Sequence, residues 1–188
     1  GDLAFLRAQG WDIDILAHVR RGGHVLGLCG GYQLLGRMIV DPDGLDGPAG
    51  SVAGLGLLDI ATTMSADKST TQVHGVHCAT DTPITGYEIH LGRTEGPDCQ
   101  RPVVRLAGRP DGAASPNSRV QGTYVHGIFT SDVFRQAWLT SFDVTSGLAY
   151  ESRIEQALDA LADHLEAHLD IDAILDIARS RQSRTTIA

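Results

Sequence analysis

The stretch RGGHVLGLCGGYQLLGR, residues 21–37, joins a short apolar run to a helical pattern through a single cysteine. Residues 24–28 are mostly apolar and bounded by glycines, which favours a buried parallel strand. From residue 32 to residue 39 the apolar side chains return at helical spacing. Cys29 is therefore predicted to lie at a turn between a strand and a helix.

The residues around this cysteine, GLCGG at 27–31, have the glycine-x-nucleophile-x-glycine form of a nucleophile elbow. Such a turn lifts the side chain above the edge of the sheet, places a thiol at the positive end of a helix, and presents backbone N–H groups to an oxyanion. A buried structural cysteine beside a tight turn would fit the same five residues. A nucleophile is favoured only if an acid–base partner exists elsewhere.

A thiolate that attacks an amide needs an acid to protonate the leaving amine, and this acid is normally a histidine. The segment VQGTYVHGIF, residues 120–129, predicts an apolar strand that ends at His126. That places the imidazole at the same kind of strand end as Cys29. Other histidines are weaker candidates, because they lie on predicted helices or open the cysteine's own strand: His18, His164, His168 and His24.

The rest of the chain predicts an α/β protein with a strand-rich middle and a C-terminal helical segment. Helices are expected in residues 2–20, as two short pieces broken at Gly10, and at 151–169 and 171–178. Strands are expected at residues 57–62, 70–78, 84–91, 103–107 and 119–125. Surface loops are expected at residues 41–56 and 108–118, and a frayed basic tail at 179–188.

Composition narrows the class of partner. A chain of 188 residues that is 42% hydrophobic can bury one core, with a helical tail. Its net charge of −8 argues against nucleic acid or an anionic membrane surface and favours a small neutral or zwitterionic substrate. Three cysteines favour a reducing compartment over a disulfide framework. With no signal peptide and no apolar run of membrane length, a soluble cytoplasmic protein is expected.

Two metal sites are considered and neither is predicted. The aspartates of residues 41–56 suggest calcium, but Leu45 occupies the third ligand position of an EF-hand loop and no glutamate closes it. His74, His77 and Cys78 suggest zinc, but their spacing is not that of a zinc finger, and adjacent strand residues point to opposite faces.

The segments GLCGGYQLLG at 27–36 and GTYVHGIF at 122–129 resemble the class I, or triad-type, glutamine amidotransferases. With GLGLLDIAT at 54–62 and GYEIHLGRT at 86–94, the chain is more narrowly similar to the amidotransferase domains of the cobyric acid synthase family. The resemblance implies a flavodoxin-like, mixed and mostly parallel sheet flanked by helices.

The same resemblance implies the domain layout. Residues 1–150 would be the amidotransferase domain without its first strands, and residues 151–188 would be helices packed on that domain, with the basic tail. The family's glycine turn before residue 2, which supplies an oxyanion donor, would be missing. Low glutaminase activity of the chain by itself is therefore expected.

The resemblance also implies residue roles. Cys29 would attack the side-chain amide of glutamine, giving a thioester and ammonia, and His126 would shuttle the proton. The N–H of Gly30 would serve the oxyanion hole, and Gln33 would contact the bound glutamine. Most class I members carry a glutamate two residues after the histidine, where this chain has Ile128. Glu88 is a candidate to orient the imidazole instead; alternatively, Glu88 and His90 are structural or contact substrate.

No cofactor is expected in this chain, because it lacks the G-x-x-x-x-G-K-[ST] phosphate loop. The resemblance implies that ATP and Mg belong to an N-terminal synthetase domain of the same polypeptide, which would bind the corrinoid substrate and receive the ammonia. Two other amidotransferase contexts stay open: cobyrinate a,c-diamide synthase and a cell-wall glutamate amidation complex. A non-enzymatic alternative is a DJ-1-like cysteine sensor, which would need no distant histidine.

Overall fold

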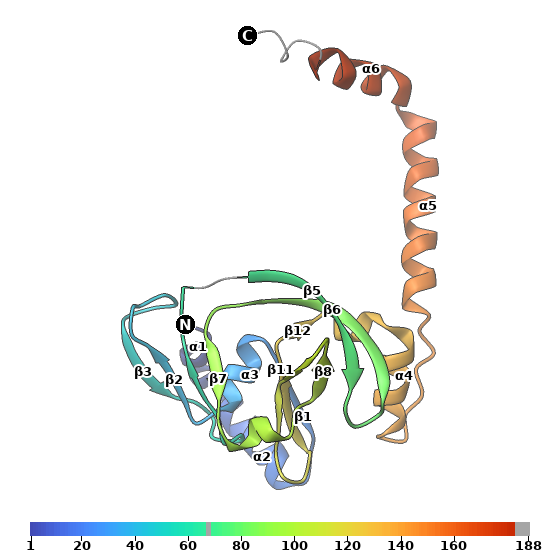
Figure 1. The fold of residues 1–188 in the computed structure, drawn as a ribbon. Coiled ribbons are helices and arrows are strands. Elements are labelled where there is room, and N and C mark those ends of the chain that lie inside the picture. The colour runs from blue at the N-terminus through green and yellow to red at the C-terminus, as the bar shows by residue number, and fades with distance from the viewer. Residues whose placement is uncertain (67–68, 183–188) are drawn as a thin grey trace. The chain divides into compact units, whose positions relative to one another are not determined.

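A computed structural model describes residues 1–66 and 69–182 of the chain. Contacts between residues divide the chain into two compact units, Gly1–Ser146 and Gly147–Ala188. Figure 1 shows the elements of both units, coloured along the chain. None of the helices in the described residues combines the length and the apolar character of a membrane span.

The elements of the first unit are short. Its helices are α1 (Asp2–Ala8), α2 (Trp11–Arg20), α3 (Gly30–Leu35), α4 (Asp132–Thr140) and the 3₁₀ helices η1 (Pro97–Gln100) and η2 (Ile128–Thr130). Its strands are β1 (Val25–Leu28), β2 (Met38–Asp41), β3 (Gly50–Ala53), β4 (Ala61–Thr63), β5 (Ser69–His77), β6 (Thr82–His90), β7 (Arg93–Glu95), β8 (Val104–Leu106), β9 (Arg109–Asp111), β10 (Ala113–Ala114), β11 (Val120–Thr123) and β12 (Val125–His126). The second unit contains α5 (Tyr150–His168) and α6 (Ile171–Gln182).

The mixed α/β class is confirmed, with the described strands in three sheets. Their strand orders are β1-β11-β10, β12-β6-β5-β8-β9 and β3-β2-β4-β7. The pairing differs from the mostly parallel sheet that was expected: β1–β11 and β2–β4 are parallel, and the other described ladders are antiparallel. The reason is loop length, since short links such as those joining β5 to β6 and β8 to β9 permit only antiparallel neighbours.

The five-stranded sheet is strongly curled. Glu88 on β6 forms an ion pair with Arg109 on β9, although β5 and β8 lie between these strands in the sheet order. The long β5–β6 hairpin, green in Figure 1, pairs over its full nine residues from Ser69 opposite His90 to His77 opposite Thr82. β6 is therefore a continuous support to which β12 adds at one edge.

The opening of the chain agrees with its sequence pattern. The predicted break between two helices is confirmed at Gly10, which has a left-handed backbone with φ of 74°. The predicted strand of residues 24–28 is confirmed as β1, and a helix begins directly after Cys29. The strands predicted at 70–78, 84–91, 103–107 and 119–125 are confirmed as β5, β6, β8 and the pair β11 and β12.

Four of the predicted segments differ from the structure. The helix expected at 32–39 ends at Leu35, because Gly36 turns to extended backbone and the N–H of Arg37 donates to the carbonyl of Ile60 at 2.8 Å. The predicted loop 41–56 contains β3, whose four residues are all exposed and so show no apolar alternation. The predicted loop 108–118 contains the short strands β9 and β10, and the strand expected at 57–62 begins only at Ala61.

In the second unit, the long helix is confirmed as α5. The next helix, α6, continues to Gln182, so the expected tail at 179–188 begins as helix. Residues 183–188 of that tail lie outside the described residues. The packing of residues 151–188 on the amidotransferase domain stays a prediction.

Two apolar clusters form the core of the first unit. One joins the curled sheet to α4 and η2: Val73, Ile84, Val103, Val104, Leu106, Ala114, Val125, Ile128 and Phe134. The other lies around α3: Tyr32, Leu35, Leu58, Ile60, Ala113, Val120 and Tyr124. Each large apolar side chain removed from water contributes about 1.5–3 kcal/mol. The second cluster therefore fastens α3 to the sheet formed by β1, β11 and β10.

Two glycines let α3 approach that sheet closely. A Cβ atom on Gly27 would lie 2.7 Å from the backbone of Gly31 in α3. A Cβ atom on Gly122 would lie 2.1 Å from the ring of Tyr32, which is only 1% exposed. These two glycines face each other across the parallel β1–β11 ladder. The β1–β11 ladder thus has no side chain at the two positions where α3 packs against it.

The substitution Gly122→Ala should lower the free energy of unfolding by about 2–3 kcal/mol, because the buried ring of Tyr32 must move to admit the new methyl group. Denaturant unfolding measures this loss. Gly147→Ala is the matched control, since a Cβ there would meet nothing within 4 Å. Equal unfolding midpoints for the two variants would contradict the close helix–sheet approach.

Candidate active site

Cys29 lies at the N-cap of α3 in a conformation that non-glycine residues rarely adopt, with φ of 52° and ψ of −114°. Its N–H donates to the carbonyl of Thr123 at 3.0 Å, and its own carbonyl accepts from the N–H of Gln33 at 3.2 Å. The backbone is therefore held from both sides in a strained turn between a strand and a helix. This is the geometry of a nucleophile elbow.

The thiol of Cys29 points at β6. It is partly buried, and its Sγ donates to the carbonyl oxygen of Ile89 at 3.5 Å. Burial raises the pKa of this thiol above its ordinary value, and a hydrogen bond from the N–H of Gly30 offsets only part of that rise. The sequence argument that a helix start favours the thiolate is thus outweighed by desolvation. The six-residue α3 is also too short to have a strong dipole.

His126 meets the same strand. It pairs with Tyr87 in the antiparallel β12–β6 ladder, and its ring stacks on the Tyr87 ring with centroids 5.0 Å apart and planes at 9°. Ile89, which receives the thiol of Cys29, is two residues further along β6. Two strand residues span about 7 Å and share one face. The backbone contact of the Cys29 thiol and the ladder partner of His126 therefore lie two residues apart along β6.

The imidazole of His126 includes a buried nitrogen. Among the described residues, the buried Nε2 has no hydrogen-bond partner. A buried ring nitrogen without a partner costs free energy, so such an atom suggests a role with a bound molecule. The preceding residue, Val125, is fully buried and anchors the strand end.

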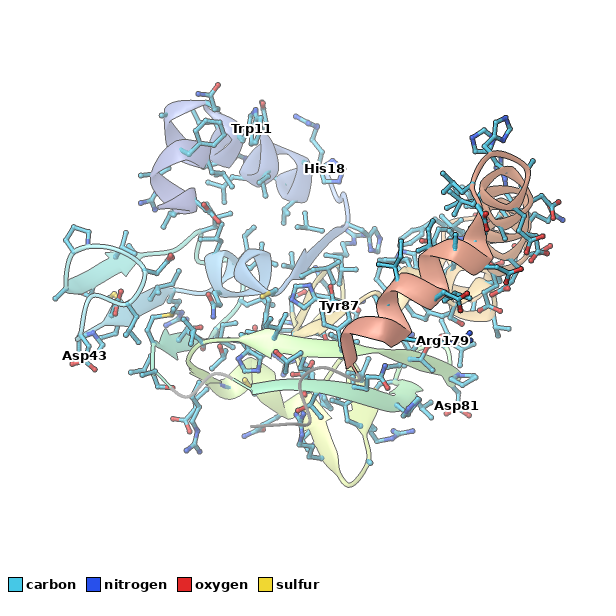
Figure 2. All side chains as sticks on the ribbon, turned by 90° about the horizontal axis from the view of Figure 1, so that it is seen from above. Trp11, His18, Asp43, Asp81, Tyr87 and Arg179 are labelled. Carbon is cyan, nitrogen blue, oxygen red and sulfur yellow. The ribbon has the colours of Figure 1, made fainter. Side chains whose placement is uncertain are left out.

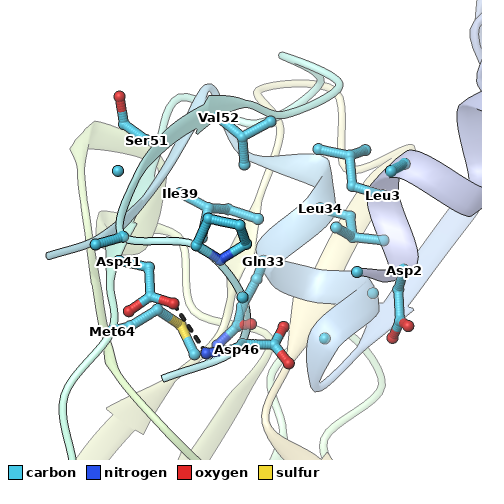
Figure 3. A pocket seen from close by; sticks show the side chains of 18 residues that line it. Asp2, Leu3, Gln33, Leu34, Ile39, Asp41, Asp46, Ser51, Val52 and Met64 are labelled. Atoms are coloured by element: carbon cyan, nitrogen blue, oxygen red, sulfur yellow. Dashed lines mark hydrogen bonds between the residues drawn. The ribbon is translucent and has the colours of Figure 1, made fainter. Parts of the chain in front are cut away.

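The residues that follow Cys29 line a cavity of about 470 Å³, which Figure 3 shows from close by. Gly30 and Gly31 form part of its wall, and a Cβ on either would meet nothing within 4 Å. This volume lies within the usual range of about 300–1,000 Å³ for small-molecule sites. Neither Cys29 nor His126 lines it. Its apolar and acidic side chains include Leu3, Leu34, Ile39, Val52, Met64, Asp2, Asp41 and Asp46.

Gln33 lines this cavity and is also tied into the interior. Its Nε2 donates to the carbonyl of Leu91 at 3.0 Å and to the hydroxyl of Tyr124 at 3.2 Å. The Tyr124 hydroxyl shares a hydrogen bond with Thr94, whose hydroxyl lies 2.6 Å from that of Thr62. The amide nitrogen of Gln33 therefore joins α3 to the end of β6 and, through two hydroxyls, to β7 and β4.

Asp41 is a structural residue of the cavity's loop. Its two carboxylate oxygens accept from the N–H groups of Leu45 and Asp46 at 2.8 and 2.9 Å. These bonds lower the pKa of the Asp41 carboxyl. Within the described residues no three His, Cys, Asp or Glu side chains are grouped as a metal site.

His77, which the sequence suggested for zinc, has a packing role. It is 1% exposed, and its ring packs against those of Phe134 and Trp138 at centroid distances of 5.1 and 5.5 Å. Its Nδ1 is hydrogen-bonded to Thr80 at 2.8 Å. Burial lowers the pKa of His77 and keeps its ring neutral in the core.

Glu88 and His90 lie on the other face of β6 from His126. Glu88 pairs with Val125 across the ladder and forms its ion pair with Arg109, leaving Oε1 without a partner among the described residues. The His90 ring stacks on Tyr124 with centroids 3.7 Å apart, and its Nδ1 donates to the carbonyl of Gly92 at 3.2 Å. The structure does not bring Glu88 to the imidazole.

Ile128, at the position where most class I members have a glutamate, is 1% exposed in the core. The residue that does touch the imidazole, Tyr87, was missed by the sequence reasoning. The only signal for it is its place beside Glu88 in the segment at 86–94.

Residues 1–134 match the model of the CobB/CobQ-like glutamine amidotransferase domain. The cobyric acid synthase of Bradyrhizobium diazoefficiens is 64% identical over 180 residues, which are 95% of this chain and 37% of that protein. Those of Cereibacter sphaeroides and Paracoccus denitrificans are 61% and 59% identical, with the same shares covered. The chain thus spans about 37% of the length of these curated relatives. It belongs to the CobB/CobQ-like glutamine amidotransferase family.

Proposed function

We propose that this chain hydrolyses glutamine through a Cys29 nucleophile and a His126 acid–base, releasing ammonia for an amide ligase. The observation that carries the proposal is the strained Cys29 turn, whose thiol meets β6 two residues from the partner of His126. Membership of an amidotransferase family supports the same chemistry. An inert structural cysteine would need neither the strain nor the nearby imidazole.

The chemistry begins with a protonated thiol, because burial raises its pKa. His126 takes the proton as the sulfur bonds to the amide carbon of glutamine, and its free Nε2 suits that role. The developing oxyanion accepts from the N–H of Gly30. His126 then gives the proton to the leaving ammonia, and water hydrolyses the γ-glutamyl thioester to glutamate. A positioned acid–base of this kind contributes about 10²–10⁴ in rate.

The cavity beside the turn is the proposed site for glutamine. Gly30 and Gly31 expose their backbone there, and Gln33 lines it. The carboxylates of Asp2 and Asp46 give the lining a negative charge that suits the α-ammonium group of an amino acid. Contact between Gln33 and the bound glutamine stays part of the proposal.

The proposed use of the ammonia follows the relatives, which are named cobyric acid synthases. In this proposal a synthetase domain of the same polypeptide binds ATP, Mg and a corrinoid, and amidates carboxylates of the corrin ring. A reducing compartment such as the cytoplasm suits the three free cysteines of the chain.

The substitution Cys29→Ser should reduce glutamine hydrolysis by about 10⁴-fold or more, because the sulfur nucleophile is lost. Glutamate release by the purified chain measures this. Cys78→Ser is the matched control, because Cys78 is also free and partly buried. It directly follows β5, at the opposite end of that strand from the residues that pair near Ile89. Equal loss in both variants, or activity that survives Cys29→Ser, would exclude Cys29 as the nucleophile.

The raised pKa of Cys29 gives a pH prediction for the chain without substrate. Well below its pKa the thiolate fraction grows tenfold for each pH unit, so alkylation of Cys29 by iodoacetamide should rise by about tenfold between pH 7 and pH 8. Mass mapping of the labelled peptide isolates Cys29 from the other thiols. A rate already constant from pH 6 upward would mean that a thiolate–imidazolium pair exists before glutamine binds.

A further inference from the structure

Among the described residues, no carboxylate is paired with the imidazole of His126, although such a partner commonly fixes a ring of this kind. Glu88 leaves β6 on the opposite face and pairs with Arg109, and Ile128 is packed in the core. A ring that turns freely about its Cβ–Cγ bond would present its nitrogen to the sulfur only part of the time. Some other group must hold it.

We propose that Tyr87 is the positioning residue that holds His126, by lying flat against its ring. This inference rests on the proposed function, because it assigns Tyr87 a part in the Cys29 and His126 chemistry. The two rings are directly opposed across the β12–β6 ladder, 5.0 Å apart and nearly parallel at 9°. Figure 2 labels Tyr87, whose side chain is 44% exposed.

Two glycines allow the rings to come together. A Cβ on Gly86, which precedes Tyr87, would lie 2.2 Å from the carbonyl oxygen of His126. Gly127, which follows His126, turns the chain with φ of 71°, and a Cβ there would lie 3.8 Å from the Tyr87 ring. Tyr87 and His126 thus each have a glycine neighbour in the chain, and the absence of these two side chains lets β6 and β12 approach closely.

Stacking can orient the imidazole, as a carboxylate partner would, without forming a hydrogen bond to either ring nitrogen. The flat contact restricts the plane of the imidazole, while Nε2 stays unpartnered and available to the sulfur. When His126 accepts the proton, its positive charge lies over an aromatic face within the roughly 6 Å range of a cation–π attraction. Tyr87 therefore acts on the chemical step and leaves glutamine binding unchanged.

The test uses a chloroketone analogue of glutamine, which alkylates the nucleophile after it binds, so that binding (KI) and chemistry (kinact) are measured separately. Tyr87→Leu keeps apolar bulk and removes the aromatic face; it should lower kinact by about tenfold and leave KI within about twofold. Tyr87→Phe keeps the face and should match the unsubstituted chain. Glutamine hydrolysis should follow the same order in kcat, with KM unchanged.

Phe5→Leu is the matched control. Phe5 is an exposed aromatic residue that touches a single ring, that of Trp11, edge-on at 5.8 Å. Its substitution should leave both constants unchanged. Thermal melting checks each variant, and Tyr87→Met replaces Tyr87→Leu if the latter does not fold.

The outcomes separate this inference from the proposed function. If glutamine-protected labelling of Cys29 persists and Tyr87→Leu labels at the unsubstituted rate, the positioning role is wrong and the amidotransferase chemistry stands. A tenfold loss in Tyr87→Phe as well would assign the effect to the hydroxyl group and overturn the stacking role. Labelling of the unsubstituted chain at Cys78 or Cys99 alone would overturn the proposed function itself.

Discussion

The close contact between α3 and the sheet below it is the constraint on which the site depends. Gly27 and Gly122 remove the side chains that would keep the helix away, and Tyr32 fills the space over Gly122. The chain must then turn from β1 into α3 within one residue, and Cys29 takes a backbone conformation that is unfavourable by about 1–3 kcal/mol. Burial of Tyr32 and Leu35 offsets that strain.

The site also requires one structural element that contacts both Cys29 and His126, which are far apart in the sequence. That element is β6, because the Cys29 thiol donates a hydrogen bond to the carbonyl of Ile89 and His126 pairs with Tyr87 in the β12–β6 ladder. β6 is itself paired with β5 over nine residues, which is the longest of the described ladders. The burial that this arrangement imposes on the thiol also raises its pKa, so the proposed chemistry requires a base to take its proton.

The sequence predicted those parts of the site that local pattern determines. Cys29 follows an apolar run, and His126 ends a second one. Both strand ends could therefore be predicted from the sequence. The end of α3 could not, because contact with Ile60 draws the chain away after Leu35. Strand β3 has no alternation to detect, since it is exposed throughout.

Contacts between strands that are distant in the sequence could not be predicted either. The partner of Glu88 depends on how far the five-stranded sheet curls, and nothing local to residue 88 encodes Arg109. Whether Glu88 or Tyr87 faces the imidazole depends on the register of β12 against β6, and a shift of one residue would exchange them.

The amide nitrogen of Gln33 has a fixed role as the donor to the groups under the cysteine turn. The carbonyl of Leu91 can only accept, so the amide nitrogen of Gln33 must face it, and the same nitrogen donates to Tyr124. The Tyr124 hydroxyl is also hydrogen-bonded to that of Thr94, and the Thr94 hydroxyl to that of Thr62; in both pairs either hydroxyl can be the donor. An acceptor-only group in place of the amide of Gln33 would leave the carbonyl of Leu91 facing a second acceptor, so the position one turn after Cys29 requires a side chain that can donate.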